Sequence, residues 1–368
     1  MGTVKIGIVG IGVISGIYLE NITKVFKEIE VIAVCDLVKE KAERAVKEYN
    51  IPKIYDTMEE LFADPEIDIV LNLTRPYEHY DVTYGALMAG KHVYTEKPLG
   101  ATLEEGRKLT ALAKEKGLLI GGAPDTFLGA GIQTCRKLIE SGFIGTPVGA
   151  SAFMVCRGHE SWHSDPEFYY KFGGGPMLDM GPYYITALVN LLGGVSSVSG
   201  MTKASFAKRT ITSEPLNGTV IDVDVPTYVT GIMQFESGAI GTIFTTFDVY
   251  TAEVPRIEIY GSEGTLSVPD PNTFGGPVRL YRAGSNEFKE IPLMFDYEVN
   301  SRALGLADMA KAIQTGRCIR AKNDQLLHVL EIMTSFQTSS EQGKHICIES
   351  KFEREKPMVY GLLKGILD

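Results

Sequence analysis

Residues 7–16 read GIVGIGVISG, and this stretch decides the expected fold. It follows an apolar run and precedes a helix-like segment, so a strand, a glycine loop and a helix are predicted in that order. One glycine lets the chain turn tightly, and the next lets a pyrophosphate approach the helix N-terminus. The third small residue of this pattern is Ser15 instead of glycine, and serine is small enough for close packing of helix against strand. The stretch predicts a dinucleotide-binding loop formed by Gly10, Gly12, Val13 and Ile14.

An acidic residue supports the same interpretation. Asp36 ends the second apolar run, VIAVCD, where a carboxylate accepts hydrogen bonds from the ribose of an adenosine. Leu37 follows it instead of an arginine. Because the carboxylate repels a 2'-phosphate and no adjacent cation binds one, NAD is favoured over NADP.

The spacing of the apolar runs predicts how the chain is divided into domains. Up to about residue 122, short apolar strands alternate with amphipathic helices such as 102–117, where Thr102 and Glu105 form a capping-box pattern. This indicates a parallel sheet, and a dinucleotide-binding α/β Rossmann domain over residues 1–123. From 124 to 368 the runs show period-two features, Gly-rich turns and returning helices, which predict an α+β domain with an antiparallel or mixed sheet.

Composition narrows the class of protein. A chain of 368 residues is expected to form two domains, and its net charge of −10 argues against nucleic-acid binding. No apolar run approaches the ~20 residues of a membrane helix, so no membrane partner is expected. The five cysteines are scattered without disulfide or CxxC spacing, which favours a reducing cytoplasm.

Three further stretches resemble the Gfo/Idh/MocA oxidoreductase family: TRPYEHYDVTYGALMAGKHVYTEKPLG, ESGFIGTPVGA and GGGPMLDMGPYYITALVNLLGG. With the glycine loop they span about the first half of the chain. The resemblance implies a Rossmann domain followed by a domain with a large, open-faced, mostly antiparallel sheet. Such a sheet is commonly used for oligomerisation, so a homodimer or homotetramer is expected.

The resemblance also implies site residues. Glu96 and Lys97, from the Glu-Lys-Pro motif, close the nicotinamide end of the site. Lys97 is expected to hydrogen-bond the substrate oxygen, and burial can tune a lysine toward proton exchange. The loop beside the ribose and nicotinamide contributes Thr74, Pro76 and His79.

The second motif carries a substitution. It reads Asp179-Met180-Gly181-Pro182-Tyr183, where most family members have histidine in place of Tyr183. A tyrosine becomes an acid or base near neutrality only beside a cation, which Lys97 can supply. Tyr183 is therefore predicted as the acid/base, with Asp179 orienting either the substrate or Lys97.

Residues 159–163, HESWH, match the H-E-x-x-H pattern of zinc proteases. Zinc binding requires both imidazoles on one helical face, but the segment follows a strand and precedes Pro166, which disfavours a helix. No metal is therefore expected. We instead predict a loop that contacts a hydroxylated small-molecule substrate, through Arg157, His159, Trp162 and His163 together with Asp125.

These features favour an NAD-dependent dehydrogenase that acts on a secondary alcohol of a sugar, polyol, glycoside or cyclic diol. Three alternatives remain open: a redox-neutral enzyme that retains NAD, a cofactor-sensing regulator on the same scaffold, and a zinc hydrolase.

Overall fold

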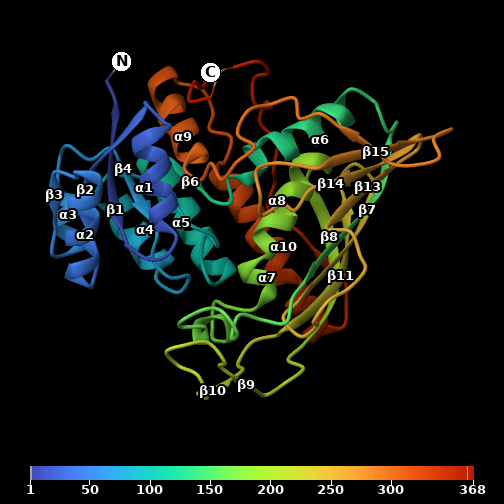
Figure 1. Cartoon of the computed structure of the whole chain (residues 1–368), viewed down its shortest axis with the longest axis horizontal. Helices are drawn as coiled ribbons and strands as arrows, with labels where there is room; N and C mark the ends of the chain where they lie inside the picture. Colours follow the sequence, from blue (N-terminus) through green and yellow to red (C-terminus); the bar gives the residue numbers. More distant parts are fainter. Residues whose placement is uncertain (1, 363) are drawn as a thin grey trace.

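A computed structural model describes residues 2–362 and 364–368 (Figure 1). The first sheet is parallel and runs in the order β3-β2-β1-β4-β5-β6. This is the Rossmann order, and it reverses between β1 and β4, where such folds bind dinucleotides. Its strands are β1 (Val4–Val9), β2 (Ile29–Cys35), β3 (Lys53–Ile54), β4 (Ile69–Asn72), β5 (His92–Thr95) and β6 (Ile120–Gly122).

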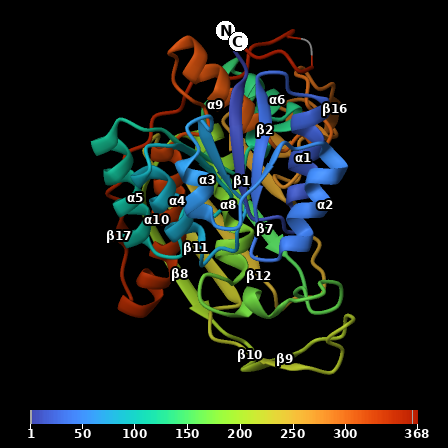
Figure 2. The ribbon, with the colours of Figure 1, turned by 90° about the vertical axis from the view of Figure 1, so that its left-hand side faces the viewer.

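Helices cover both faces of this sheet. Figure 2 shows α1 and α2 on one side of β1 and β2, and α4 and α5 on the other. The Thr102 side chain accepts the amide hydrogen of Glu105 at the start of α5, so the predicted capping box is confirmed. The helices are α1 (Ser15–Lys24), α2 (Lys39–Tyr49), α3 (Met58–Ala63), α4 (His79–Met88) and α5 (Leu103–Lys116).

The second sheet runs in the order β16-β15-β14-β13-β7-β12-β11-β8-β17. All its pairs are antiparallel except β7 with β12, so the expectation of a mostly antiparallel sheet is confirmed. A small hairpin of β9 (Lys208–Thr210) and β10 (Val220–Asp222) projects beyond it. The strands of the large sheet are β7 (Pro147–Val155), β8 (Val195–Lys203), β11 (Tyr228–Phe235), β12 (Ile240–Thr246), β13 (Ile257–Gly261), β14 (Gly264–Val268), β15 (Val278–Arg282), β16 (Lys289–Ile291) and β17 (Ile346–Cys347).

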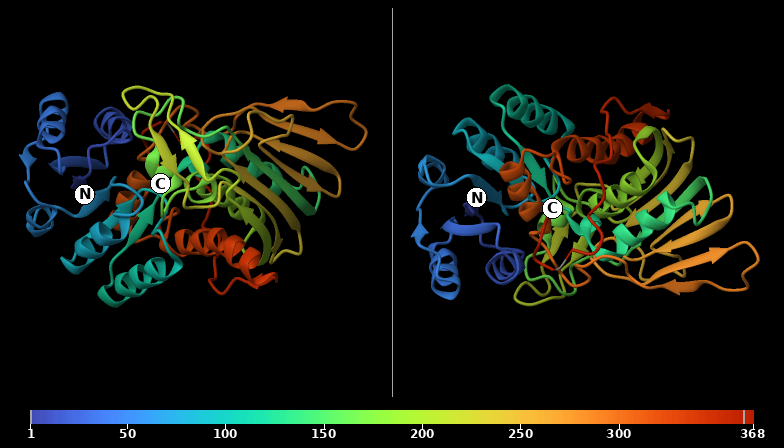
Figure 3. Two further views of the ribbon diagram at one scale, coloured as in Figure 1. Left: turned by 90° about the horizontal axis from the view of Figure 1, so that it is seen from below. Right: turned by 90° about the horizontal axis from the view of Figure 1, so that it is seen from above.

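Helices lie against one face of the large sheet and leave the other face open, as the views from below and above show (Figure 3). On the open face, Met201, Ile232 and Ile240 are exposed, and the Tyr228 and Phe244 rings pack at a tilt with centroids 4.8 Å apart. The predicted oligomer stays a prediction. The helical segments are η1 (Thr126–Leu128), α6 (Ala130–Glu140), η2 (Glu167–Tyr170), α7 (Pro176–Asp179), α8 (Gly181–Leu192), α9 (Leu304–Thr315) and α10 (Asn323–Gln342).

Helices α9 and α10 return from the second half of the chain to the Rossmann sheet. Gly122 in β6 donates its amide hydrogen to the Ala321 carbonyl at 3.2 Å. A Cβ atom on Gly106 in α5 would lie 2.7 Å from Leu330 of α10, so the two helices pack in close contact. The division at residue 123 stays a prediction.

Among the described residues, no helix combines the length and apolar character that a bilayer crossing requires.

Candidate functional site

The glycine loop joins β1 to α1 with the geometry that a dinucleotide requires. Gly10 has φ +96°, and a Cβ atom there would lie 2.9 Å from the Leu73 carbonyl, so only glycine fits. A Cβ atom on Gly12 would meet nothing within 4 Å, which leaves room for a phosphate group beside the backbone. Ser15 is buried and donates its hydroxyl hydrogen to the Gly12 carbonyl at 2.8 Å. These residues fit a bound dinucleotide.

Asp36 lies directly beside this loop. Its carboxylate accepts the amide hydrogens of Ile11 at 2.6 Å and Val38 at 2.8 Å. The side chains of Val13 and Leu37 are 92% and 95% exposed, and two apolar groups held in solvent suit contact with an adenosine. The described geometry is consistent with NAD.

The loop after β4 is held by hydrogen bonds of its own. The Thr74 hydroxyl donates to the buried side-chain oxygen of Asn72 at 2.6 Å. His79 is buried, with Nδ1 2.7 Å from the Pro98 carbonyl and Nε2 3.1 Å from the Thr74 carbonyl. Both ring nitrogens of His79 therefore face backbone carbonyls, and its place beside the cofactor stays a prediction. Pro76 lies on the same loop, half-buried.

Lys97 and Asp179 meet across the two halves of the chain. Lys97 follows β5, Asp179 ends α7, and Nζ lies 3.0 Å from Oδ1 and 2.7 Å from the Asp179 carbonyl. Of the two roles predicted for Asp179, the structure thus places it against Lys97. Burial acts to lower the pKa of Lys97, as expected, but attraction to Asp179 outweighs it and the pKa is raised. Lys97 is consequently an ammonium donor, and the tuning toward proton exchange is not realised.

The same pairing fixes the charge of the carboxylate. Burial acts to raise the pKa of Asp179, but Lys97 and His159 outweigh it and lower the value to about 2. Glu96, the neighbour of Lys97, points inward and accepts the Tyr18 hydroxyl hydrogen at 2.8 Å and the Lys97 amide hydrogen at 3.1 Å.

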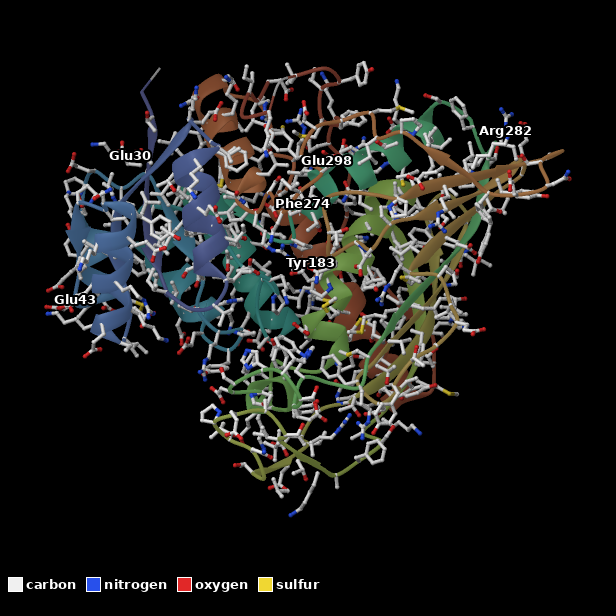
Figure 4. The ribbon with its side chains drawn as sticks, viewed as in Figure 1. Glu30, Glu43, Tyr183, Phe274, Arg282 and Glu298 are labelled. Carbon is white, nitrogen blue, oxygen red and sulfur yellow. The ribbon has the colours of Figure 1, made fainter. Side chains whose placement is uncertain are left out.

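Tyr183 lies near the centre of the molecule, on α8 between the Rossmann domain and the large sheet (Figure 4). Nζ of Lys97 is 5.2 Å from the centroid of its ring. A second cation, Arg302, was not identified from the sequence because it lies in an irregular loop more than 100 residues downstream. Burial acts to lower the pKa of Arg302, but attraction and a hydrogen bond to Tyr183 outweigh it and raise the value. Two cations therefore flank this tyrosine.

His159 also reaches the carboxylate. Its Nε2 lies 3.1 Å from Oδ2 of Asp179, and its ring packs on Tyr169 with centroids 4.0 Å apart. Tyr169 was not predicted. Burial, together with Asp179, raises its pKa although Lys97 opposes this, which places the Tyr169 phenol near the same charged groups.

The HESWH segment forms a turn, as expected, and its histidines do not share a helical face. Glu160 is engaged elsewhere: Oε1 accepts from Arg209 at 2.7 Å, and Oε2 accepts the Tyr170 hydroxyl hydrogen. Among residues 2–362 and 364–368, no cluster of three or more His, Cys, Asp or Glu side chains could hold a metal.

Of the other predicted substrate residues, Trp162 lies beside both His159 and His163, with ring centroids 5.2 and 5.4 Å apart, whereas the Arg157 side chain packs on other rings. Arg157 lies between the rings of Phe206 and Tyr250, at 5.2 and 4.9 Å from their centroids. Trp162 is 63% exposed, and His163 Nδ1 accepts the Asp165 amide hydrogen at 3.0 Å.

Asp125 is buried, with 1% of its surface exposed to solvent. Its carboxylate accepts the Gly305 amide hydrogen at 3.0 Å, and burial raises its pKa to about 6. The contact of Asp125 with a substrate stays a prediction.

A bridge between the two halves was not expected from the sequence. Arg75, on the loop after β4, pairs with Asp165 at 2.9 Å and lies 5.7 Å from the centroid of the Phe168 ring. This contact joins the cofactor loop to the loop that carries His159.

Two family models match the chain. The first, described as "Oxidoreductase family, NAD-binding Rossmann fold", covers residues 4–122, and the second, "GFO/IDH/MocA C-terminal domain", covers residues 132–267. Together they span more than half of the sequence.

Curated relatives and solved structures agree with these matches. The scyllo-inositol 2-dehydrogenase (NAD(+)) of Bacillus subtilis is 26% identical over 95% of this chain and 97% of the relative. The 1,5-anhydro-D-fructose reductase of Ensifer adhaerens is 29% identical over 64% of this chain and 67% of that protein. A levoglucosan dehydrogenase in complex with NADH and L-sorbose has the same fold, with a TM-score of 0.80 at 20% identity, covering 95% of this chain and 100% of that one.

Proposed function

Because the chain belongs to the Gfo/Idh/MocA family of NAD-binding oxidoreductases, we propose that it oxidises a secondary alcohol of a sugar, polyol, glycoside or cyclic diol. The general activity, an NAD-dependent dehydrogenase acting on sugars or polyols, follows from the family and its relatives. The proposal adds the assignment of residues. It rests on one observation: the Lys97–Asp179 pair and Tyr183 lie together where the Rossmann domain meets the second domain.

NAD, when bound, supplies the acceptor for the hydride that leaves the carbinol carbon. The Gly10–Ile14 loop would hold its pyrophosphate, Asp36 its adenosine ribose, and the Thr74–His79 loop would border its nicotinamide end. Lys97 would donate a hydrogen bond to the substrate oxygen, because its ammonium is kept charged by Asp179. This bond strengthens as negative charge develops on that oxygen during oxidation.

Tyr183 would take the hydroxyl proton. The O–H bond of the substrate breaks as the C–H bond gives up its hydride, and the phenolate oxygen of Tyr183 accepts the proton. Lys97 lies against the ring of Tyr183 and Arg302 lies beside its hydroxyl, so positive charge flanks the proposed proton acceptor. The exposed indole of Trp162 offers an apolar surface for a hydroxylated ring.

The proposal is tested by following reduced nicotinamide absorbance with NAD or NADP and a panel of sugars, inositols, glycosides and cyclic diols. Lys97→Met and Tyr183→Phe variants run in parallel should lose at least about 100-fold in kcat. Cofactor binding, measured by quenching of protein fluorescence, should survive in both variants.

Two other results would redirect the proposal. Copurified NAD without net turnover on any substrate would favour a redox-neutral cycle. Binding of NAD together with no dependence of any activity on Lys97 or Tyr183 would favour a cofactor-sensing regulator.

A further inference from the structure

Arg75 makes a side-chain contact between the two segments that border the proposed site. It lies on the loop after β4, residues 74–79, which we call the cofactor loop. Its partners lie between β7 and α7, in residues 156–175, which we call the substrate segment. Nη2 of Arg75 lies 2.9 Å from Oδ2 of Asp165, and its guanidinium carbon lies 5.7 Å from the centroid of the Phe168 ring. We call these two contacts the Arg75 bridge.

The cofactor loop holds Arg75 in place from its own side. Nη1 of Arg75 donates to the Tyr77 hydroxyl at 3.1 Å, and its backbone amide donates to the Glu78 carboxylate at 3.1 Å. The glycine loop touches the same backbone, because a Cβ atom on Gly10 would lie 3.0 Å from the Thr74 nitrogen. A dinucleotide bound on the glycine loop would therefore lie beside the backbone that carries Arg75.

On its other side, the Arg75 bridge leads into a cluster of packed rings. The Asp165 amide donates to Nδ1 of His163 at 3.0 Å. The Phe168 ring packs on His163 and Tyr169, with centroids 5.6 and 4.1 Å away. His163 in turn packs on Trp162, with centroids 5.4 Å apart. Because packed rings move together, the position of Asp165 and Phe168 constrains the indole that the proposed function assigns to the substrate.

Two ion pairs anchor the substrate segment to the second domain. Glu160 pairs with Arg209 at 2.7 Å, and Lys171 pairs with Asp224 at 2.8 Å. The Arg75 bridge attaches the same segment to the Rossmann domain. Its two charged side chains are 52% and 47% exposed, and an ion pair at such exposure shifts an equilibrium by up to about fivefold. The bridge is therefore strong enough to favour docking of the segment and weak enough to open.

We propose that Arg75 is a positioning residue that couples the binding of NAD to the binding of the substrate. When NAD occupies the glycine loop, the cofactor loop holds Arg75 in one position, and Arg75 holds the substrate segment in its docked position. Because such coupling is reciprocal, a substrate bound to the docked segment also tightens the binding of NAD. The proposal rests on the proposed dehydrogenase function and adds a residue that acts through Asp165 and Phe168.

Trp162 makes this coupling measurable without a substrate. It is the one tryptophan of the chain, it is 63% exposed, and it lies on the substrate segment close to Asp165. Its fluorescence therefore reports on this segment alone. The test is quenching of that fluorescence by acrylamide, in the protein alone and with saturating oxidised NAD. In wild type, NAD should lower the quenching constant by about twofold or more, as a fivefold shift toward the docked position would.

Asp165→Asn decides between coupling and direct shielding, because it removes the ion pair and leaves the sequence of the cofactor loop intact. In this variant the NAD-dependent decrease of the quenching constant should be lost, and Arg75→Gln should lose it as well. The double variant should behave like either single variant, since both substitutions remove the same contact. Binding of NAD to each variant is measured by isothermal titration calorimetry, so that saturation is assured.

Arg107→Gln is the matched control. Arg107 lies on α5 with a side chain that is 50% exposed, and it also joins the first half of the chain to the second, through a 2.7 Å pair with Glu349. This variant should retain the NAD-dependent decrease. A decrease that persists in Asp165→Asn would overturn the proposal, because the bound NAD would then shield the indole by itself. The same conclusion would follow if wild type bound NAD without any decrease.

Failure of the proposed function would be visible in a different measurement. It would be an absence of turnover with every substrate, while wild type still shows the NAD-dependent decrease of quenching. With a substrate that does turn over, Asp165→Asn should raise its KM by about fivefold and change kcat less, because the Arg75 bridge contributes to binding. A fall in kcat with an unchanged KM would also overturn the proposal.

Discussion

Replacing Asp179 by asparagine tests the ion pair at the centre of the site. The pKa of Asp179 lies at about 2 in the folded protein against an ordinary value of 3.8. At about 1.4 kcal/mol per pH unit, this difference corresponds to about 2 kcal/mol of native-state stabilisation at pH 7. The side chains of Asp179 and Lys97 are 15% and 16% exposed, so screening by solvent removes little of it.

The sign of the pH dependence follows from both partners. A lowered carboxyl pKa contributes stability that is present above about pH 4 and is lost as the pH falls toward 2. The raised pKa of Lys97 contributes stability that is present below its ordinary value of 10.5 and is lost only at still higher pH. The free energy of coupling between the two side chains should therefore be constant between about pH 5 and 9.

The assay is a double-mutant cycle with Asp179→Asn, Lys97→Met and the double variant, measured by urea unfolding across that pH range. We expect a coupling free energy of about 2 kcal/mol. In Asp179→Asn, burial acts on Lys97 without its main opposing attraction, so the pKa of the lysine falls and alcohol oxidation declines at a lower alkaline pH than in wild type. A coupling below about 0.5 kcal/mol, the limit of additivity for independent sites, would refute the reasoning.

Three other perturbations give separate tests. Asp36→Ser combined with Leu37→Arg removes the carboxylate and adds a cation. The ratio of kcat/KM for NADP to kcat/KM for NAD should therefore rise by at least about tenfold. An unchanged ratio would contradict the role of Asp36. Gly12→Val fills open space without a clash inside the protein, so NADH binding should be lost while the melting temperature stays within about 2 °C of wild type. Burial raises the pKa of Asp125 to about 6, so the buried carboxyl lowers the stability of the folded protein as the pH rises above 4. Asp125→Asn should therefore raise the melting temperature, measured by differential scanning calorimetry, more at about pH 8 than at about pH 4.

The fold was predictable where local pattern and tertiary structure agree. The buried strands β1, β2, β4, β5 and β6 are largely apolar, and α5 has a capping box that the local sequence displays. The edge strand β3 spans only Lys53–Ile54 and was not expected, since a two-residue strand has no period of its own. Strand β8 was also not expected, because its Ser, Gly and Thr residues show little apolar pattern.

The site residues likewise divide into those that a local motif marks and those that it does not. Lys97, Asp179 and Tyr183 stand in recognisable motifs, and the structure brings them together. Arg302 and Tyr169 stand in no recognised motif, because Arg302 lies in an irregular loop and Tyr169 in the short η2 segment, whose directions depend on distant contacts. Arg75 lies within one of the family-like stretches, but its pairing with Asp165 likewise depends on a distant loop. Asn21 in α1 illustrates this: its side chain donates to the carbonyls of Asn300 and Arg302 at 3.0 and 2.8 Å, and no local sequence signal predicts that anchor.

The return of α9 and α10 to the first sheet limits how this protein can be recombined with its relatives. A graft of residues 1–123 onto another catalytic domain would expose Gly106 and Gly122 where Leu330 and Leu326 now pack. It would also remove the Ala321 carbonyl that accepts the Gly122 amide hydrogen. For a protein engineer, the exchangeable cassette for cofactor preference is therefore discontinuous. It consists of the N-terminal segment together with a matched copy of residues 304–342.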